Sequence, residues 1–232
     1  MIQVRPAAER GGFDFGWLDT KHTFSFGEFH DPDWSGFSVL RVLNEDRVLP
    51  GQGFGTHGHR DMEILTWVLE GAIEHKDSLG NGEVLRPGEI QRMSAGTGIR
   101  HSEFNPSADS ALHFLQIWIV PARPGIPPSY EQKVVDPALL EGIFGVVASP
   151  DGRGGSVRIQ QDATLSIARL KAGREATIAL GEGRAGWVQV ARGATELAGH
   201  ELTAGDGVAV RGETRLSFRA SADSEILVFD LP

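Results

Sequence analysis

The sequence predicts an all-β protein made of two copies of one β-barrel unit. Its 30 glycines and 12 prolines divide the 232 residues into short segments. These segments are rich in Val, Ile, Leu, Phe and Trp and are bounded by turn-forming residues, which is typical of strands. Patterns of helical period are short and scarce, the best being Pro137–Glu141. Many short strands separated by turns favour a sandwich or a barrel.

Strand patterns occur in both halves of the chain. The clearest are Phe37–Val42, Glu63–Leu69, Leu112–Val120, Trp187–Ala191, Gly207–Val210 and Glu225–Phe229. Between the halves, residues 121–137 hold five prolines, which block both a helix and a central strand. We therefore expect a linker here, with one domain at residues 1–132 and a second at 133–232.

A weak internal repeat supports the two-unit prediction. Leu69-Glu70-Gly71 followed by Arg86-Pro87-Gly88-Glu89 resembles Ala191-Arg192-Gly193 followed by Thr203-Ala204-Gly205-Asp206. In each half a strand, a turn ending in glycine, a second strand and a second glycine turn follow one another.

Composition excludes several function classes. The net charge is −9, and acidic residues outnumber basic ones in both halves, so direct binding to a nucleic-acid backbone is not expected. The chain has no cysteine, which excludes disulfides, thiolate nucleophiles and cysteine-ligated metals. It has no signal-peptide core and no apolar run of about 20 residues. We expect a cytoplasmic protein with no membrane partner.

Two short motifs carry the chemistry. They are His57-Gly58-His59 and His101-Ser102-Glu103. Residues i and i+2 of a strand project from the same face, so each motif can aim two ligands at one point. Two such strands facing one another inside a barrel would supply three imidazoles and a carboxylate. That set suits Fe, Mn, Ni, Co, Cu or Zn, and it leaves open positions for catalysis.

The other five histidines have no such partner in the sequence, and we expect them to be surface or core residues. They are His22, His30, His75, His113 and His200. Because only His200 lies in the second half, we expect the second domain to carry no metal.

The region around the motifs resembles a known family. The segment from Gly51 to Gly71 is similar to the first cupin motif, and Gly88 to Asn105 is similar to the second, although Ser94 stands in place of a proline. The stretches GWLDTKHTFSFGEFH, GFGTHGHRDMEILTWVLEG and MSAGTGIRHSEFNP resemble the pirin family, and its bacterial quercetin 2,3-dioxygenase-like members best. The resemblance implies a bicupin of two double-stranded β-helix (jelly-roll) barrels packed together, with His57, His59, His101 and Glu103 as ligands.

The choice between Glu63 and Glu103 also depends on strand parity. In the usual first motif the glutamate ligand is the fifth residue after the second histidine, and here that residue is Ile64. A one-residue offset sends a side chain to the opposite face. We therefore expect Glu63 to be a charged residue on the outer face, unless a bulge precedes it.

The resemblance implies an enzyme that cleaves a flavonol such as quercetin with O₂ and loss of carbon monoxide. One divalent transition metal is expected, Fe(II) first, with Mn, Co, Ni, Cu or Zn as alternatives. Glu103 would be the catalytic residue that accepts the proton of the flavonol hydroxyl.

An apolar substrate needs an apolar pocket. Phe54, Met93 and Phe104 adjoin the motifs and are the expected pocket neighbours. An aromatic stretch earlier in the chain is expected to seal the barrel or the interface between the halves, with pocket lining as the alternative. It comprises Phe13, Phe15, Trp17, Phe24, Phe26, Phe29, Trp34 and Phe37.

Two other functions remain open at this stage. The same resemblance supports a non-catalytic metal-binding regulator that acts through a protein partner. Another cupin enzyme, such as a sugar isomerase, would add basic residues near the metal. Arg60 and Arg100 flank the ligand motifs, but strand parity places them on the face opposite the ligands.

Overall fold

The computed structural model describes all 232 residues and divides them into two compact units. The unit that we call N-terminal comprises Gly11–Val135 and Val157–Gln161. The C-terminal unit comprises Met1–Arg10, Asp136–Ser156 and Asp162–Pro232. Residues 1–10 belong to the C-terminal unit because β1 (Ile2–Arg5) pairs with β20 (Gly207–Arg211). Pairing across such a sequence separation leaves no local signal, and the predicted single boundary at 132/133 does not include it.

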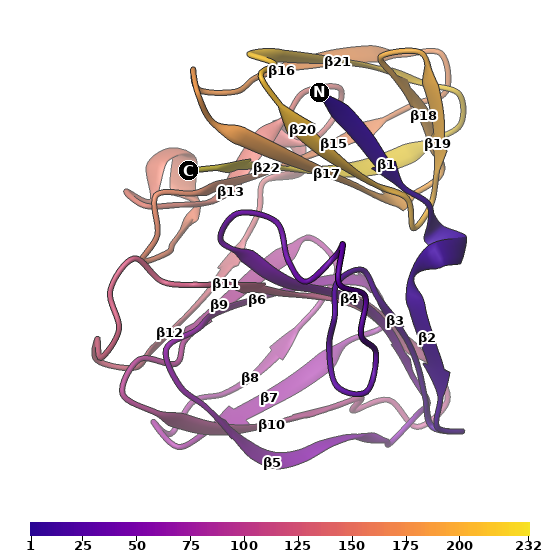
Figure 1. Ribbon diagram of the computed structural model, residues 1–232. Helices are drawn as coiled ribbons and strands as arrows, with labels where there is room; N and C mark the ends of the chain where they lie inside the picture. The colour runs from indigo at the N-terminus through magenta and orange to yellow at the C-terminus, as the bar shows by residue number, and fades with distance from the viewer. The chain divides into compact units, whose positions relative to one another are not determined.

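The N-terminal unit has two sheets that lie as separate layers across its interior (Figure 1). One sheet has the order β12-β9-β6-β11-β4-β3-β2 and the other β5-β10-β7-β8. The strands of the first are β2 (Gly11–Asp14), β3 (Leu18–His22), β4 (Leu40–Val48), β6 (Glu63–Glu70), β9 (Glu89–Ser94), β11 (Leu112–Ile119) and β12 (Ser129–Val134). Those of the second are β5 (Gly53–His59), β7 (Ile73–Asp77), β8 (Gly82–Leu85) and β10 (Ile99–Phe104).

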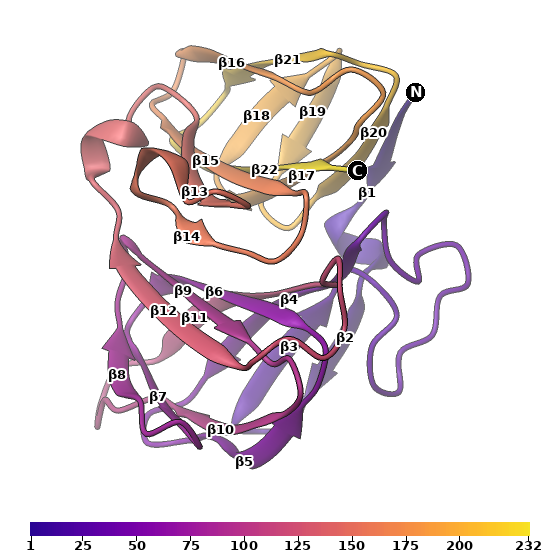
Figure 2. The same cartoon turned by 90° about the vertical axis from the view of Figure 1, so that its left-hand side faces the viewer.

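The C-terminal unit repeats this plan, as the view in Figure 2 also shows. Six strands follow the order β1-β20-β17-β22-β15-β13, and a second sheet has the order β16-β21-β18-β19. The remaining strands are β13 (Gly145–Ser149), β15 (Thr164–Leu170), β16 (Glu175–Ala179), β17 (Ala185–Arg192), β18 (Ala194–Leu197), β19 (His200–Thr203), β21 (Arg215–Ala220) and β22 (Ser224–Leu231). The predicted all-β fold of two barrels is confirmed.

The glycines of the internal repeat occupy equivalent turns. Gly71 lies between β6 and β7, and Gly193 lies between β17 and β18. Their φ angles are +76° and +71°, a region that favours glycine. A Cβ at either position would also meet a backbone carbonyl, that of Ala111 or of Asp223. The repeat in the sequence therefore marks the same two constraints in each barrel.

Three expected segments differ in detail. The strand expected at Phe37–Val42 begins at Leu40 and continues to Val48. The predicted linker contains β12, which lies between prolines and at the edge of its sheet, where one side needs no partner. The short helix at Pro137–Glu141 is reduced to a 3₁₀ turn, Pro137–Leu139, like those at Ala7–Glu9 and Arg153–Gly155. No helix is long and apolar enough to cross a bilayer.

The interior of the N-terminal barrel changes character along β11. Alternate residues on one face of this strand are Leu112, Phe114, Gln116 and Trp118. Leu112 and Phe114 pack in a core cluster with residues of both sheets. Gln116 and Trp118 instead line a cavity. One part of the barrel is thus filled by apolar side chains, and the other part is left open for the site.

Candidate metal centre

The two ligand motifs lie on neighbouring strands of one sheet. The expectation that these strands face one another across the barrel is wrong, because β5 and β10 pair antiparallel. His57 lies directly opposite His101 in this ladder. The register then shifts between His101 and Glu103, so that Glu103 lies opposite Phe54. This bulge lengthens β5 relative to β10, a device that often redirects a side chain near a site.

Three imidazoles converge at this point. The ring centroids of His57 and His101 are 4.4 Å apart, and that of His59 lies 4.8 and 4.9 Å from them. One ligand nitrogen from each ring lies within 4.8 Å of the others. Nδ1 of His57 contacts the carbonyl oxygen of Gly55 at 2.8 Å. Nε2 of His101 is buried and has no hydrogen-bond partner in the protein, which fits a nitrogen that a metal would bind.

Burial keeps the rings of His59 and His101 neutral, which is the protonation state that metal binding requires. Desolvation, with a smaller contribution from the nearby His57, lowers the pKa of His59 to about 4. Desolvation followed by the charges of the neighbouring imidazoles lowers the pKa of His101 to about 2. Each of these two rings, His59 and His101, therefore has a nitrogen with a free lone pair at neutral pH.

Glu103 lies beside this cluster and is 3% exposed. Nε2 of Gln116 donates to both of its carboxylate oxygens, at 3.2 and 3.1 Å. Desolvation raises the pKa of Glu103 to about 7, with Gln116 acting in the opposite direction and Asp46 adding to the rise. One carboxylate oxygen of Glu103 and one ring nitrogen each of His75 and His101 also lie within 4.8 Å of one another.

His75 is a site residue that the sequence analysis missed. It was expected to be an ordinary core or surface histidine, yet its Nδ1 lies 3.4 Å from Nδ1 of His101. Its Nε2 lies 3.0 Å from Oδ2 of Asp77. Both side chains come from β7, the other neighbour of β10. The sequence signal was the pattern His75-Lys76-Asp77, which places a histidine and a carboxylate on one face of a strand.

Glu63 lies on the opposite face of β6 from the cavity, as parity predicted. The adjacent Ile64 is cross-strand from Trp118, which lines the cavity. Glu63 is nevertheless fully buried rather than a charged residue at a solvent-facing surface. It accepts hydrogen bonds from Oγ of Ser94 at 2.9 Å and from the backbone of Gln160 at 3.1 Å. Burial raises its pKa, and these two bonds act in the opposite direction.

A cavity of about 490 Å³ adjoins the imidazoles and Glu103. Its apolar walls include Trp17, Phe26, Phe54 and Trp118. Trp118 meets the ring of His59 edge to face at a centroid distance of 4.9 Å, and Phe26 meets Trp118 at 5.4 Å. This volume and lining are typical of a site for a small aromatic molecule.

The aromatic stretch divides between two roles. Phe13, Phe15, Trp17 and Phe26 line cavities, so the preferred sealing interpretation is wrong for them. Phe24, Trp34 and Phe37 are buried core residues. Of the expected neighbours, Phe54 lines the metal cavity, Met93 packs in a core cluster and Phe104 is partly exposed.

Arg60 and Arg100 are exposed and lie together along a different surface, near Ser78. The guanidinium of Arg60 donates to the carbonyl of Thr97 at 3.1 and 3.2 Å. Strand parity had predicted that both arginines lie on the face opposite the ligands, and neither side chain lines the metal cavity.

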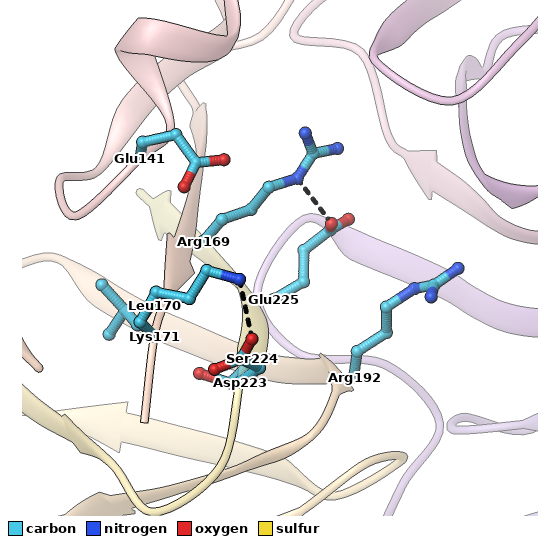
Figure 3. A pocket seen from close by; sticks show the side chains of 8 residues that line it. All are labelled: Glu141, Arg169, Leu170, Lys171, Arg192, Asp223, Ser224 and Glu225. Atoms are coloured by element: carbon cyan, nitrogen blue, oxygen red, sulfur yellow. Dashed lines mark hydrogen bonds and ion pairs between the residues drawn. The ribbon is translucent and has the colours of Figure 1, made fainter. Parts of the chain in front are cut away.

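The C-terminal unit has a cavity of a different chemical kind (Figure 3). It measures about 330 Å³, and charged side chains dominate its walls. Arg169 pairs with Glu225 at 2.8 Å, and Lys171 pairs with Asp223 at 2.7 Å. The lining contains no histidine. The candidate metal centre is therefore the one in the N-terminal barrel.

Comparisons with known proteins show the family of this chain. The chain matches the family model Pirin over residues 3–119 and the model Quercetinase C-terminal cupin domain over residues 146–231. A quercetin 2,3-dioxygenase of Escherichia coli strain K12 is 49% identical over 232 residues, covering 100% of this chain and 99% of that protein. A pirin-like protein of Caulobacter vibrioides is 40% identical over 231 residues, covering 99% of each. The crystal structure of the bacterial pirin YhhW from Escherichia coli in complex with nickel(II) has a TM-score of 0.95 and 49% identity, covering 100% of this chain and 99% of that one.

Proposed function

This chain belongs to the pirin family, and from that premise we propose that it is a metal-dependent dioxygenase that cleaves a flavonol such as quercetin with O₂. The observation that carries the proposal is the cluster of three imidazoles beside an aromatic-walled cavity of about 490 Å³. The relatives named quercetin 2,3-dioxygenase support the substrate class.

The proposed ligands are His57, His59, His101 and Glu103, in the N-terminal domain, with no metal in the C-terminal domain. Convergence of the imidazoles and the missing hydrogen-bond partner of Nε2 of His101 support the three histidines. Position beside His101 on the same strand supports Glu103. We propose Fe(II) as the metal, although the complex of YhhW holds nickel(II) and the ligand set accepts several divalent ions. When bound, such an ion supplies Lewis acidity for the flavonol hydroxyl and open coordination positions.

The protein's own side chains then perform three tasks. Glu103, a buried carboxylate beside the imidazoles, accepts the proton of the flavonol hydroxyl. Gln116 holds this carboxylate in place through its two hydrogen bonds. Trp118 and Phe26 offer flat apolar faces that orient the planar rings of the substrate and exclude water.

The proposal is tested with metal-loaded protein, quercetin and air. We expect loss of the flavonol absorption band, uptake of oxygen and release of carbon monoxide. Boiled protein and free metal at the same concentration are the controls. Absence of oxygen uptake with each of Fe, Mn, Co, Ni and Cu would contradict the proposal and favour the regulatory alternative.

A further inference from the structure

A second cavity adjoins the metal cavity in the N-terminal barrel. It measures about 270 Å³, and four residues line both cavities: Phe26, Asn44, Asp46 and Phe54. Phe13 and Phe15 add apolar wall. The two cavities therefore lie side by side and share part of their walls.

The inner face of β3 and β4 is polar where these cavities meet. In the ladder Thr20 lies opposite Asp46, and His22 lies opposite Asn44. Residues of the same parity farther along these strands, Leu18 and Val48, belong to the apolar core. A buried polar patch on the inner face of a barrel costs stability unless its groups form hydrogen bonds.

Three acceptor atoms of this patch have no partner in the protein. They are Oδ1 of Asp46, Oδ1 of Asn44 and Nδ1 of His22. The three residues are 5%, 4% and 6% exposed. In native proteins almost every buried polar atom has a partner, so three unpaired acceptors around one cavity need an explanation.

The existing bonds of these side chains define what is missing. The Thr20 hydroxyl already donates to Asp46, and the His22 ring donates to the carbonyl of Phe26. Burial lowers the pKa of His22, so the ring is neutral and its remaining nitrogen accepts. Burial also raises the pKa of Asp46 to about 7. The cavity therefore places three unpaired polar atoms between apolar walls: Oδ1 of Asn44 and Nδ1 of His22 accept at neutral pH, and the Asp46 carboxylate accepts when it is ionised.

We propose that this second cavity is a subsite for a hydroxylated aromatic ring, whose hydroxyl groups donate to Asp46, Asn44 and His22. The inference rests on the proposed function, because the ring is taken to belong to the molecule whose other end reaches the metal centre. Phe13 and Phe26 enclose the ring, and the three acceptors select for hydroxyls over hydrogens or ethers.

Two matched pairs of flavonoids test the subsite. Luteolin and chrysin differ only in the two hydroxyls of the pendant ring, and neither carries the 3-hydroxyl that the proposed reaction needs. Their dissociation constants are measured by calorimetry without oxygen, on full-length protein loaded with redox-inert Zn(II). We expect luteolin to bind about tenfold more tightly than chrysin, the effect of one to two hydrogen bonds. Equal affinities would overturn the proposal.

Variants locate the selection. Asp46→Leu and Asn44→Leu remove acceptors singly, and either should reduce the preference for luteolin severalfold while chrysin binds as before. Asp19→Asn is the matched control, since Asp19 is on β3 but is 44% exposed and paired with Lys21. If both leucine variants fold, by circular dichroism, and keep the full preference, the hydroxyls are held elsewhere, for example on the metal, and the subsite is refuted.

Failure of the subsite and failure of the proposed activity give different results. Consumption of quercetin and of galangin, its analogue without pendant-ring hydroxyls, with the same KM would refute the subsite and leave the activity standing. Selective luteolin binding that Asp46→Leu weakens would support the subsite even if no flavonol is consumed.

Discussion

Replacement of His75 by phenylalanine should weaken metal binding although His75 is not among the proposed ligands. Its Nε2 lies 3.0 Å from Oδ2 of Asp77, and its Nδ1 lies 3.4 Å from Nδ1 of His101. With Nε2–H of His75 donating to the carboxylate, Nδ1 accepts the proton of His101. That assignment leaves Nε2 of His101 as the metal-binding nitrogen.

The magnitude follows from the role of such partners. Loss of the group that orients a ligating histidine costs about 10- to 100-fold in metal affinity, which is about 1.4–2.8 kcal/mol. Phenylalanine keeps the ring that stacks on Tyr130 at a centroid distance of 4.8 Å and 25°. The loss should therefore reflect the missing nitrogens rather than a cavity, and Asp77→Asn should have an effect in the same direction.

Competition of Zn(II) with a chromophoric chelator measures the affinity. His113→Phe is the matched control, because His113 is also buried in the same unit and pairs with Glu45 at 2.9 Å, but does not line the metal cavity. We expect the control to bind zinc like the wild type. An unchanged affinity in His75→Phe would refute the positioning role, and a complete loss of the site would make His75 a ligand itself.

Three other predictions concern the barrel that holds the site. Gly53→Ala should lower zinc affinity and Gly55→Ala should not. A Cβ at Gly53 would meet the backbone of Glu103 and Phe104, whereas one at Gly55 would meet nothing. Equal zinc affinities of the two variants would contradict this prediction. Burial raises the folded pKa of Asp46 to about 7 from 3.8, so its contribution to stability is greatest below pH 4 and is lost as pH rises to 7. Asp46→Asn should flatten this decline by about 2–4 kcal/mol in urea unfolding of the metal-free protein at pH 4.5 and 7.5, and an unchanged slope would count against it. Trp67→Ala empties a fully buried position and should lower the free energy of unfolding by about 3–5 kcal/mol, and a loss below 1 kcal/mol would contradict tight packing there.

Local patterns predicted the strands well, and long-range pairing was invisible to them. Glycine turns and apolar runs predicted β6, β11, β17, β20 and β22 within about two residues at each end. The pairing of β1 with β20 joins opposite ends of the chain and depends on the finished barrel. The proline-rich stretch misled in part, because prolines exclude a central strand but permit an edge strand such as β12.

At the site, strand parity could be predicted from the sequence, but the neighbours of each strand could not. Spacing of i and i+2 brought His57 and His59 to one point and separated Ile64 from Glu63. It could not tell that β5 and β10 are neighbours, since register is set by partners elsewhere in the chain. His75 was missed because its partner, His101, is on another strand. Burial of Glu63 was missed because sequence shows which face a residue occupies, and not what covers that face.

Metal content of two glutamate variants tests the proposed four-ligand centre most directly. Glu63→Ala and Glu103→Ala each remove one buried carboxylate from the same barrel. Glu103 lines the metal cavity, whereas Glu63 lies on the face of its strand that points away from it. Both are loaded with the same metal, desalted and analysed by mass spectrometry for metal per chain. We predict that Glu63→Ala retains the wild-type content and that Glu103→Ala loses it. Retention by Glu103→Ala together with loss by Glu63→Ala would contradict the assignment.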